Sequence, residues 1–145
     1  MTAPSTTITV RTLDGLHLAG TLIAPEAASD VGVVLVHGAG VTREEGGFFA
    51  RLADGLAEVG VFSLRYDLRG HGESDGRQEE VTLSAYLNDV RVALAHVRQA
   101  TAGASRISLL GTSFGGCLAA YYAAKQQHRP RERGHRGRWG PRELQ

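Results

Sequence analysis

A serine enclosed by glycines is the residue best placed for chemistry in this sequence. Ser113 has Gly111 two residues before it and Gly115 two residues after it. An apolar, strand-like segment, 107–110, precedes the motif, and an apolar helical segment, 117–124, follows it. A strand-to-helix turn this tight strains its central residue and exposes that side chain at the end of a sheet. The pattern predicts that Ser113 is a nucleophile, beside a helix N-terminus that favours negative charge.

The same residues could form a purely structural turn, with Ser113 as an ordinary helix N-cap. The chain contains 19 glycines, so a five-residue match is weak evidence by itself. Two further glycine-rich motifs follow predicted strands earlier in the chain, and together they favour the nucleophile.

The second motif begins at His37 and reads His-Gly-Ala-Gly, directly after a β-branched run at 31–36. Gly38 lets the backbone approach a reacting group closely. We expect an oxyanion hole made by the N–H of Ala39 and the N–H of Phe114. His37 could act as a base, but we favour the interpretation that it braces this loop through hydrogen bonds.

The third motif, 67–76, combines charges and glycines after a strand predicted at 61–66. A binding loop and a solvated turn both fit such a composition. We interpret the segment as structural. Asp67 is expected to pair with Arg69, and His71 is expected to hydrogen-bond backbone in the same turn.

Hydrophobic periodicity predicts the elements that must position these motifs. Alternation around an Asp-Gly turn indicates an N-terminal hairpin, and continuous apolar runs indicate buried strands. The predicted strands are 7–12, 16–23, 31–36, 61–66 and 107–110, and the predicted helices are 48–59, 81–100 and 113–125. This order indicates a three-layer α/β/α sandwich with a mostly parallel sheet and right-handed crossovers.

Composition is that of a globular domain, with 42% hydrophobic and 21% charged residues in a chain of 145, enough for one core. The single cysteine, Cys117, permits no intrachain disulfide and is expected to be a small core residue. On the helix predicted at 81–100, Leu83 is expected in the core and Asp89 outside it. No metal-ligand cluster or phosphate loop is visible, so we expect no metal and no cofactor. Without a signal peptide or membrane-length apolar run, we expect a cytoplasmic location and no membrane partner.

The net charge of +1 conceals a break near residue 125. Residues 1–124 hold 9 Arg and 13 Asp or Glu, whereas residues 125–145 hold one Lys, 6 Arg and 2 Glu. We expect a partial domain at 1–125 and a basic tail without regular structure at 126–145. The tail lacks interleaved aromatic residues, so we predict no nucleic-acid partner.

In this order and spacing, the three motifs resemble those of the α/β-hydrolase superfamily, in particular its esterase, lysophospholipase and serine-aminopeptidase-like members. The resemblance covers about residues 5–125, and its nearest likeness is a feruloyl- or cinnamoyl-esterase-like carboxylesterase. It implies an N-terminal half of that fold, with strand order 1-2-4-3-5, and acyl-enzyme chemistry on a small-molecule ester or amide. The resemblance assigns the nucleophile to Ser113, the oxyanion donors to Ala39 and Phe114, and supporting roles to His37, Gly38, Gly111 and Gly115.

The resemblance also implies a triad in the chain order serine, acid, histidine. Only 32 residues follow Ser113, and the histidines among them, His128 and His135, lie in the Arg-rich tail with no strand to position them. We therefore expect the acid and the histidine to be absent and this form to be weak or inactive. A changed reading frame would produce such a tail, and that is our hypothesis for its composition.

Two functions follow from these observations. The first is a serine hydrolase acting through Ser113. The second is a non-catalytic fragment that associates through strand 107–110, because an unpaired apolar edge promotes pairing with another chain.

Overall fold

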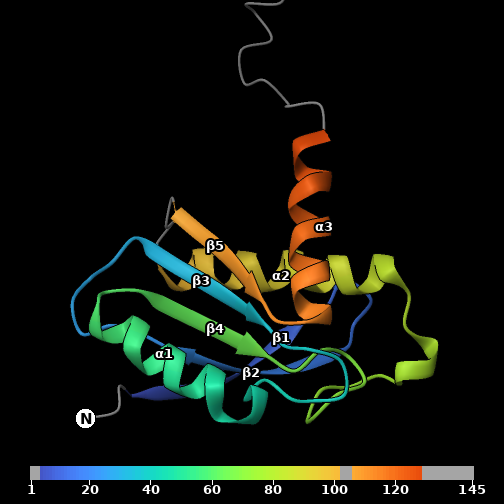
Figure 1. Ribbon diagram of the computed structural model, residues 1–145, viewed down its shortest axis with the longest axis horizontal. Helices are drawn as coiled ribbons and strands as arrows, with labels where there is room; N and C mark the ends of the chain where they lie inside the picture. Colours follow the sequence, from blue (N-terminus) through green and yellow to red (C-terminus); the bar gives the residue numbers. More distant parts are fainter. Residues whose placement is uncertain (1–3, 102–105, 129–145) are drawn as a thin grey trace, which may run out of the picture.

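The computed structural model describes residues 4–101 and 106–128, which form a five-stranded sheet with helices on both faces (Figure 1). The strands are β1 (Ser5–Arg11), β2 (His17–Ile23), β3 (Val31–Val36), β4 (Phe62–Tyr66) and β5 (Arg106–Gly111). The helices are α1 (Phe48–Glu58), α2 (Leu83–Ala100) and α3 (Phe114–His128), with short 3-10 helices η1 (Glu45–Gly47) and η2 (Gln78–Glu80). Every predicted strand and helix is present, with bounds close to those expected.

The strand order β1-β2-β4-β3-β5 is the order that the resemblance implied. The β1–β2 and β2–β4 pairs are antiparallel, whereas β4–β3 and β3–β5 are parallel. Val36 at the end of β3 lies opposite Tyr66 on β4 and Gly111 on β5. Two motifs begin directly after Val36 and Tyr66, and Gly111 is the first residue of the third, so the parallel strands deliver all three motifs to one edge of the sheet.

Two apolar cores lie on opposite faces of the sheet because successive side chains of a strand point to opposite sides. On one face α1 contributes Phe49 and Ala53, which pack against Val33 and Leu35 of β3. The other face is covered by α2 and the first half of α3. Its buried residues include Val34, Val36, Leu64, Tyr66, Val90, Val97 and Leu118.

Buried ion pairs in the third motif differ from the predicted ones. The Asp67 carboxylate accepts hydrogen bonds from the Arg43 backbone N–H at 2.7 Å and from its guanidinium at 2.6 Å, so the predicted pair of Asp67 with Arg69 is wrong. Arg69 instead binds Asp89 of α2 at 2.7 Å and Asp14 of the hairpin turn at 2.9 Å. Asp89 is fully buried, contrary to prediction, because a paired carboxylate tolerates burial that an isolated one does not.

The outer half of α3 leaves the core. Residues 114–124 carry no charge, which is typical of a helix that is buried all round, and Leu118 is buried. Beyond Leu118 most side chains are exposed, and α3 rises from the end of β5 and extends past the sheet (Figure 1). Cys117 on the same helix is exposed, so its predicted core position is wrong.

The expectation that β5 is buried is also wrong. Among the described residues β5 pairs only with β3, and its side chains alternate between exposed and half-buried. Leu83, at the first position of α2, is 46% exposed, because the apolar stripe of that helix reaches the core only from Leu87 onward. The strand and helix patterns were identified correctly, but the neighbours that would complete their burial are not among the described residues.

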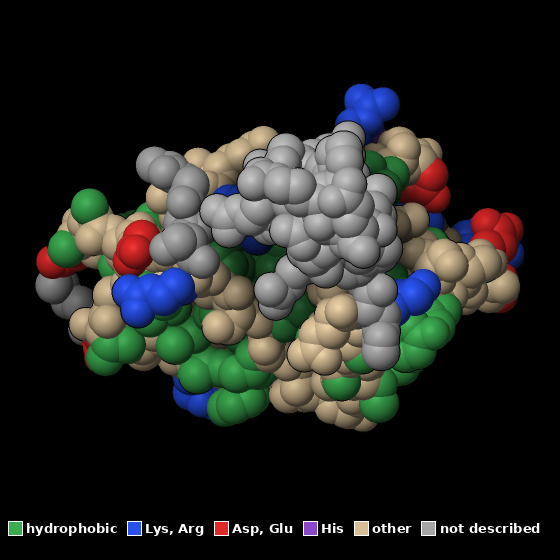
Figure 2. Space-filling model, turned by 90° about the horizontal axis from the view of Figure 1, so that it is seen from above, with side chains coloured by type: hydrophobic (Ala, Val, Ile, Leu, Met, Phe, Trp, Pro, Cys, Tyr) green, Lys and Arg blue, Asp and Glu red, His purple; other side chains and the backbone are tan. Residues whose placement is uncertain are grey.

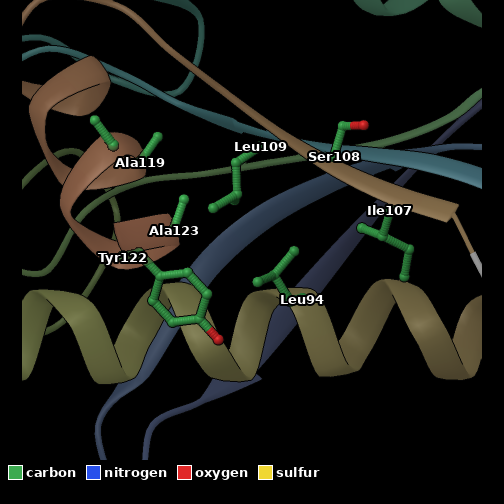
Figure 3. A pocket seen from close by; sticks show the side chains of 8 residues that line it. Leu94, Ile107, Ser108, Leu109, Ala119, Tyr122 and Ala123 are labelled. Atoms are coloured by element: carbon green, nitrogen blue, oxygen red, sulfur yellow. The ribbon is translucent and has the colours of Figure 1, made fainter. Parts of the chain in front are cut away.

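An open groove of about 490 Å³ lies between α2, β5 and α3. Its lining residues are Leu94, Ile107, Ser108, Leu109, Ala119, Ala120, Tyr122 and Ala123. Leu94, Leu109 and Tyr122 point toward the same space from three different elements (Figure 3). The free edge of β5 is therefore bordered by an apolar hollow.

Seen from above, hydrophobic side chains gather in patches along the lower part of the visible surface, and acidic side chains lie toward its left and right ends (Figure 2). Helix α3 ends at His128, three residues beyond the boundary that the charge break predicted, and the rest of the expected tail lies outside the described residues. None of the described helices combines the length and the apolar character that a bilayer crossing requires.

Candidate functional site

Ser113 lies in the sharp turn between β5 and α3. Its φ is 52°, a left-handed value that L-residues avoid and that costs on the order of 1–3 kcal/mol. The Thr112 N–H donates to the Val36 carbonyl at 3.1 Å, which holds the turn against the end of β3. The Ser113 side chain is exposed at the start of α3. A hydroxyl held in this way is accessible to a substrate and lies next to the N–H groups of a helix N-terminus.

The glycines on either side of Ser113 are required by close backbone packing. A Cβ on Gly111 would overlap the Gly115 carbonyl, and a Cβ on Gly115 would overlap the carbonyl of Val36. The first turn of α3 is thus pressed against the ends of both β3 and β5. Any side chain at these two positions would push α3, and Ser113 with it, away from the sheet.

His37 braces the loop that follows β3. The imidazole is fully buried, with Nδ1 2.6 Å from the Gly38 carbonyl and Nε2 2.9 Å from the Leu68 N–H. Nδ1 must therefore donate and Nε2 must accept, which makes the ring the neutral Nδ1–H tautomer. The Gly38 carbonyl and the Ala39 N–H belong to one planar trans peptide and point in opposite directions. By holding that carbonyl, His37 fixes the direction of the Ala39 N–H.

A second imidazole holds the next peptide of the same loop. His71 accepts a hydrogen bond from the Gly40 N–H at Nε2, 3.1 Å away, and its Nδ1 lies 3.1 Å from the Arg69 carbonyl. The His37 and His71 rings meet edge to face, with centroids 5.2 Å apart. Because all four ring nitrogens bind backbone, both histidines act as supports of the loop.

Two backbone donors remain available beside Ser113. Within the described residues, neither the Ala39 N–H nor the Phe114 N–H donates to a protein acceptor. A Cβ placed on Gly38 would lie 3.3 Å from the Ser113 Cβ, so the loop after β3 lies directly against the elbow. The site therefore offers an accessible hydroxyl and two N–H groups that could bind an oxyanion.

No base lies beside the serine in the part of the chain that the structure describes. No side chain among residues 4–101 and 106–127 hydrogen-bonds to the Ser113 hydroxyl. Helix α3 has 15 residues, so His128 at its far end lies roughly 20 Å from the serine. His135 lies outside the described residues.

Glu45 is a site residue that the sequence did not reveal. Its Oε2 accepts hydrogen bonds from the Gly38 N–H at 2.8 Å and from the Thr112 hydroxyl at 2.9 Å. It thus joins the loop after β3 to the elbow. Glu45 is seven residues from Gly38 in a loop with no periodic pattern, so no sequence signal marked it. Tyr86 of α2 was likewise missed, and its ring packs edge to face on Phe114 with centroids 5.4 Å apart.

Comparison with known proteins identifies a matching protein family, a related protein and several related structures. A family model described as serine aminopeptidase, S33, matches residues 27–134. An uncharacterized abhydrolase domain-containing protein of Dictyostelium discoideum is 32% identical over 100 residues, which cover 68% of this chain and 10% of that protein. The structure of Est1E from Butyrivibrio proteoclasticus with bound ferulic acid is 26% identical, with a TM-score of 0.73 over 83% of this chain and 48% of that chain.

The esterase PF2001 of Pyrococcus furiosus has the same fold, with a TM-score of 0.72 and 22% identity over 82% of this chain and 44% of that chain. The architecture is that of an α/β-hydrolase. The family match extends over more than half of the sequence, and the chain belongs to the serine aminopeptidase S33 family of these hydrolases. The chain spans less than half the length of both solved structures.

Replacement of Gly115 tests how tightly the elbow is packed. We expect Gly115→Ala to lower the free energy of unfolding by on the order of 1–3 kcal/mol, because its methyl group overlaps the Val36 carbonyl. Gly55→Ala is the matched control, since no atom lies within 4 Å of a Cβ there and alanine should stabilise α1 by about 0.5–1 kcal/mol. Urea unfolding followed by circular dichroism measures both. Equal stability of the two variants would contradict the packing described.

Acid should weaken the loop after β3 through His37. Burial is the chief cause that lowers the pKa of His37 from its ordinary value of 6.5. The unfolded chain therefore binds more protons below about pH 6.5, and stability is lost as the pH falls through this range. We expect the urea midpoint to drop between about pH 7.5 and pH 5.5, and to drop less in His37→Asn. The exposed His17→Asn is the control, and an identical pH dependence in all three proteins would refute the assignment.

Proposed function

We propose that this chain carries the nucleophile and oxyanion hole of a serine hydrolase that acts on carboxylic esters through Ser113. The observation that carries the proposal is the left-handed backbone of Ser113, with a φ of 52°, in a glycine-flanked strand-to-helix turn. Strain of this kind persists where the surrounding structure enforces it, and it is concentrated at functional sites. Membership of a hydrolase family supports the same reaction class.

The proposed reaction proceeds in two steps. The Ser113 oxygen attacks the ester carbonyl carbon, and the carbonyl oxygen becomes an oxyanion bound by the N–H groups of Ala39 and Phe114. Collapse of this intermediate expels the alcohol, which takes up the proton of the serine hydroxyl, and leaves an acyl-serine ester. Water then attacks that ester and releases the carboxylic acid, and the serine hydroxyl is restored.

The described residues offer no base to accept the proton of Ser113, and this limits the proposed reaction. A serine without a base is a poor nucleophile. Oxyanion binding and substrate binding alone therefore give only a residual acceleration over the uncatalysed reaction in water. We therefore propose weak activity that favours esters whose alcohol leaves without protonation. A p-nitrophenyl ester satisfies this condition, whereas a peptide amide needs an acid to protonate its leaving amine.

The ester class is proposed from the comparison with Est1E. The structure of that relative contains bound ferulic acid, an aromatic carboxylic acid, and it is 26% identical to this chain. Tyr86 and Phe114 form an aromatic pair beside the proposed oxyanion donors. We propose that the substrates are esters of small carboxylic acids, including aromatic acids.

Active-site labelling tests the proposal. The folded chain should react slowly with a fluorophosphonate probe and hydrolyse p-nitrophenyl acetate and p-nitrophenyl ferulate above background. Both activities should disappear in Ser113→Ala, because the attacking oxygen is removed, while peptide mapping of the wild type should locate the phosphonate on Ser113. Ser108→Ala is the matched control, since Ser108 is an exposed serine of β5, the strand that precedes the elbow, and lies outside the elbow itself.

Labelling that survives in Ser113→Ala would assign the reactivity to another residue and refute the proposal. If the folded wild-type chain neither reacts with the probe nor hydrolyses either ester, the hydrolase proposal fails and the second candidate function, described next, remains.

A second candidate function is self-association through β5, favoured by the free edge of that strand and the apolar groove beside it. Identical strands satisfy each other's backbone N–H and C=O groups when a two-fold axis pairs them antiparallel. The groove and the uncharged part of α3, residues 114–124, adjoin this edge and would be covered by the same partner. We propose a second copy of this chain as that partner. The other edge, β1, is rich in threonine and mostly exposed.

Placing like charges at the paired edge tests the association. Ser108→Lys brings two ammonium groups together in an antiparallel β5 pair and should shift the chain from dimer to monomer in sedimentation equilibrium. Thr7→Lys, an exposed position on β1, is the control and should leave the dimer intact. A wild-type chain that remains monomeric at all concentrations would rule out this function.

A further inference from the structure

One carboxylate oxygen connects the two segments that carry the proposed oxyanion donors. Glu45 Oε2 lies 2.8 Å from the Gly38 nitrogen and 2.9 Å from the Thr112 hydroxyl oxygen. Gly38 directly precedes Ala39, and Thr112 lies two residues before Phe114. A single atom therefore relates the backbone of one donor to the backbone of the other.

The backbone around Glu45 is shaped to deliver this oxygen. Glu45, Gly46 and Gly47 have φ values of 46°, 64° and 95°, so three consecutive residues are left-handed. Glycine accepts this conformation readily, but a glutamate held in it is strained. The turn is fixed by the Glu45 N–H, which donates to the Thr42 carbonyl at 2.9 Å. Strain at a non-glycine residue persists only where its surroundings enforce it. Among the described residues, the strained Glu45 is also the residue whose side chain hydrogen-bonds to both segments.

The alternative connection between the segments is weak. Besides Glu45, the Thr112 N–H donates to the Val36 carbonyl at 3.1 Å, but this bond joins the elbow to the end of β3 and does not reach Gly38. Gly38 itself lies close to the elbow, since a Cβ placed on it would be 3.3 Å from the Ser113 Cβ and 3.6 Å from the Thr112 carbonyl oxygen. These are van der Waals contacts, which set a minimum separation but no direction. His37 and His71 orient the loop toward the segment after β4, at Leu68 and Arg69, and not toward the elbow. The Glu45 hydrogen bonds are therefore the directional contacts that join Gly38, beside one proposed donor, to the elbow, which carries the other.

We infer that Glu45 is a positioning residue that sets the spacing of the two oxyanion donors through this shared hydrogen-bonded oxygen. The inference rests on the proposed hydrolase function of Ser113. The required property is an acceptor oxygen at this point, not a negative charge, because a charge near a developing oxyanion would oppose it. Glutamine offers the same acceptor in a side chain of the same length, and alanine offers none.

Three variants separate positioning from charge and from stability. We expect the rate of Ser113 labelling by the fluorophosphonate probe to fall at least about tenfold in Glu45→Ala and to stay within about threefold of the wild type in Glu45→Gln. Glu44→Ala is the matched control, since Glu44 is the adjacent residue and binds Arg65 and Arg43 but neither segment of the site. It should label at the wild-type rate. Circular dichroism establishes that each variant is folded.

A second measurement does not depend on chemistry at Ser113. The amide hydrogen of Gly38 should exchange with solvent at least about tenfold faster in Glu45→Ala, while the Gly40 amide, which is bound to His71, should be unchanged. If the wild type does not label but the Gly38 amide responds, the proposed function fails and the Glu45 link stands. If the wild type labels but Glu45→Ala labels equally fast, or Glu45→Gln falls as far as Glu45→Ala, the inference is overturned.

Discussion

The contact between the start of α3 and the end of β3 determines the geometry of the site. At Gly115 the helix backbone lies so close to the Val36 carbonyl that no side chain fits between them. The same closeness forces the preceding turn to reverse within a few residues and puts Ser113 at a left-handed φ. The strained serine is therefore a consequence of packing a helix against a parallel strand at the shortest distance that the backbone allows. The sheet register, which places Val36 beside Gly111, makes this contact available.

A rigid elbow requires an equally rigid loop opposite it. The loop after β3 has small side chains that cannot pack, so hydrogen bonds must hold it. Three side chains bind backbone groups on either side of Ala39 in this loop. Glu45 accepts from the Gly38 N–H, His37 binds the Gly38 carbonyl, and His71 accepts from the Gly40 N–H. The Ala39 N–H between them has no protein acceptor among the described residues, and its direction is fixed by its neighbours.

The sequence predicted what depends on local pattern. Periodicity located every described strand and α-helix but neither 3-10 helix, and the spacing of Gly111 and Gly115 around Ser113 predicted the turn. Contacts between loops were beyond its reach. Asp67 and Arg69 are two residues apart, which suggested a pair, yet Arg43 and Asp89 bind them instead because the fold brings distant charges into the buried space. Glu45 was missed for the same reason: its partners are seven and 67 residues away. The apolar character of β5 and Cys117 predicted burial, but only Ile107 and Leu109 of β5 pack against the core, and Cys117 is exposed.

The described residues separate two parts of serine-hydrolase chemistry that usually act together. Binding of an oxyanion needs fixed N–H groups, and a strand, a turn and the first residue of a helix can supply them locally. Activation of the hydroxyl needs a base within hydrogen-bond reach, which must come from another part of a fold. His37 and His71 are close in space but cannot fill this role, because each uses both ring nitrogens to hold backbone. Releasing either ring to accept a proton from Ser113 would free the loop whose rigidity makes the oxyanion donors useful. In this architecture, bracing the loop after β3 and accepting a proton from Ser113 are thus competing demands on a histidine, and His37 and His71 brace the loop.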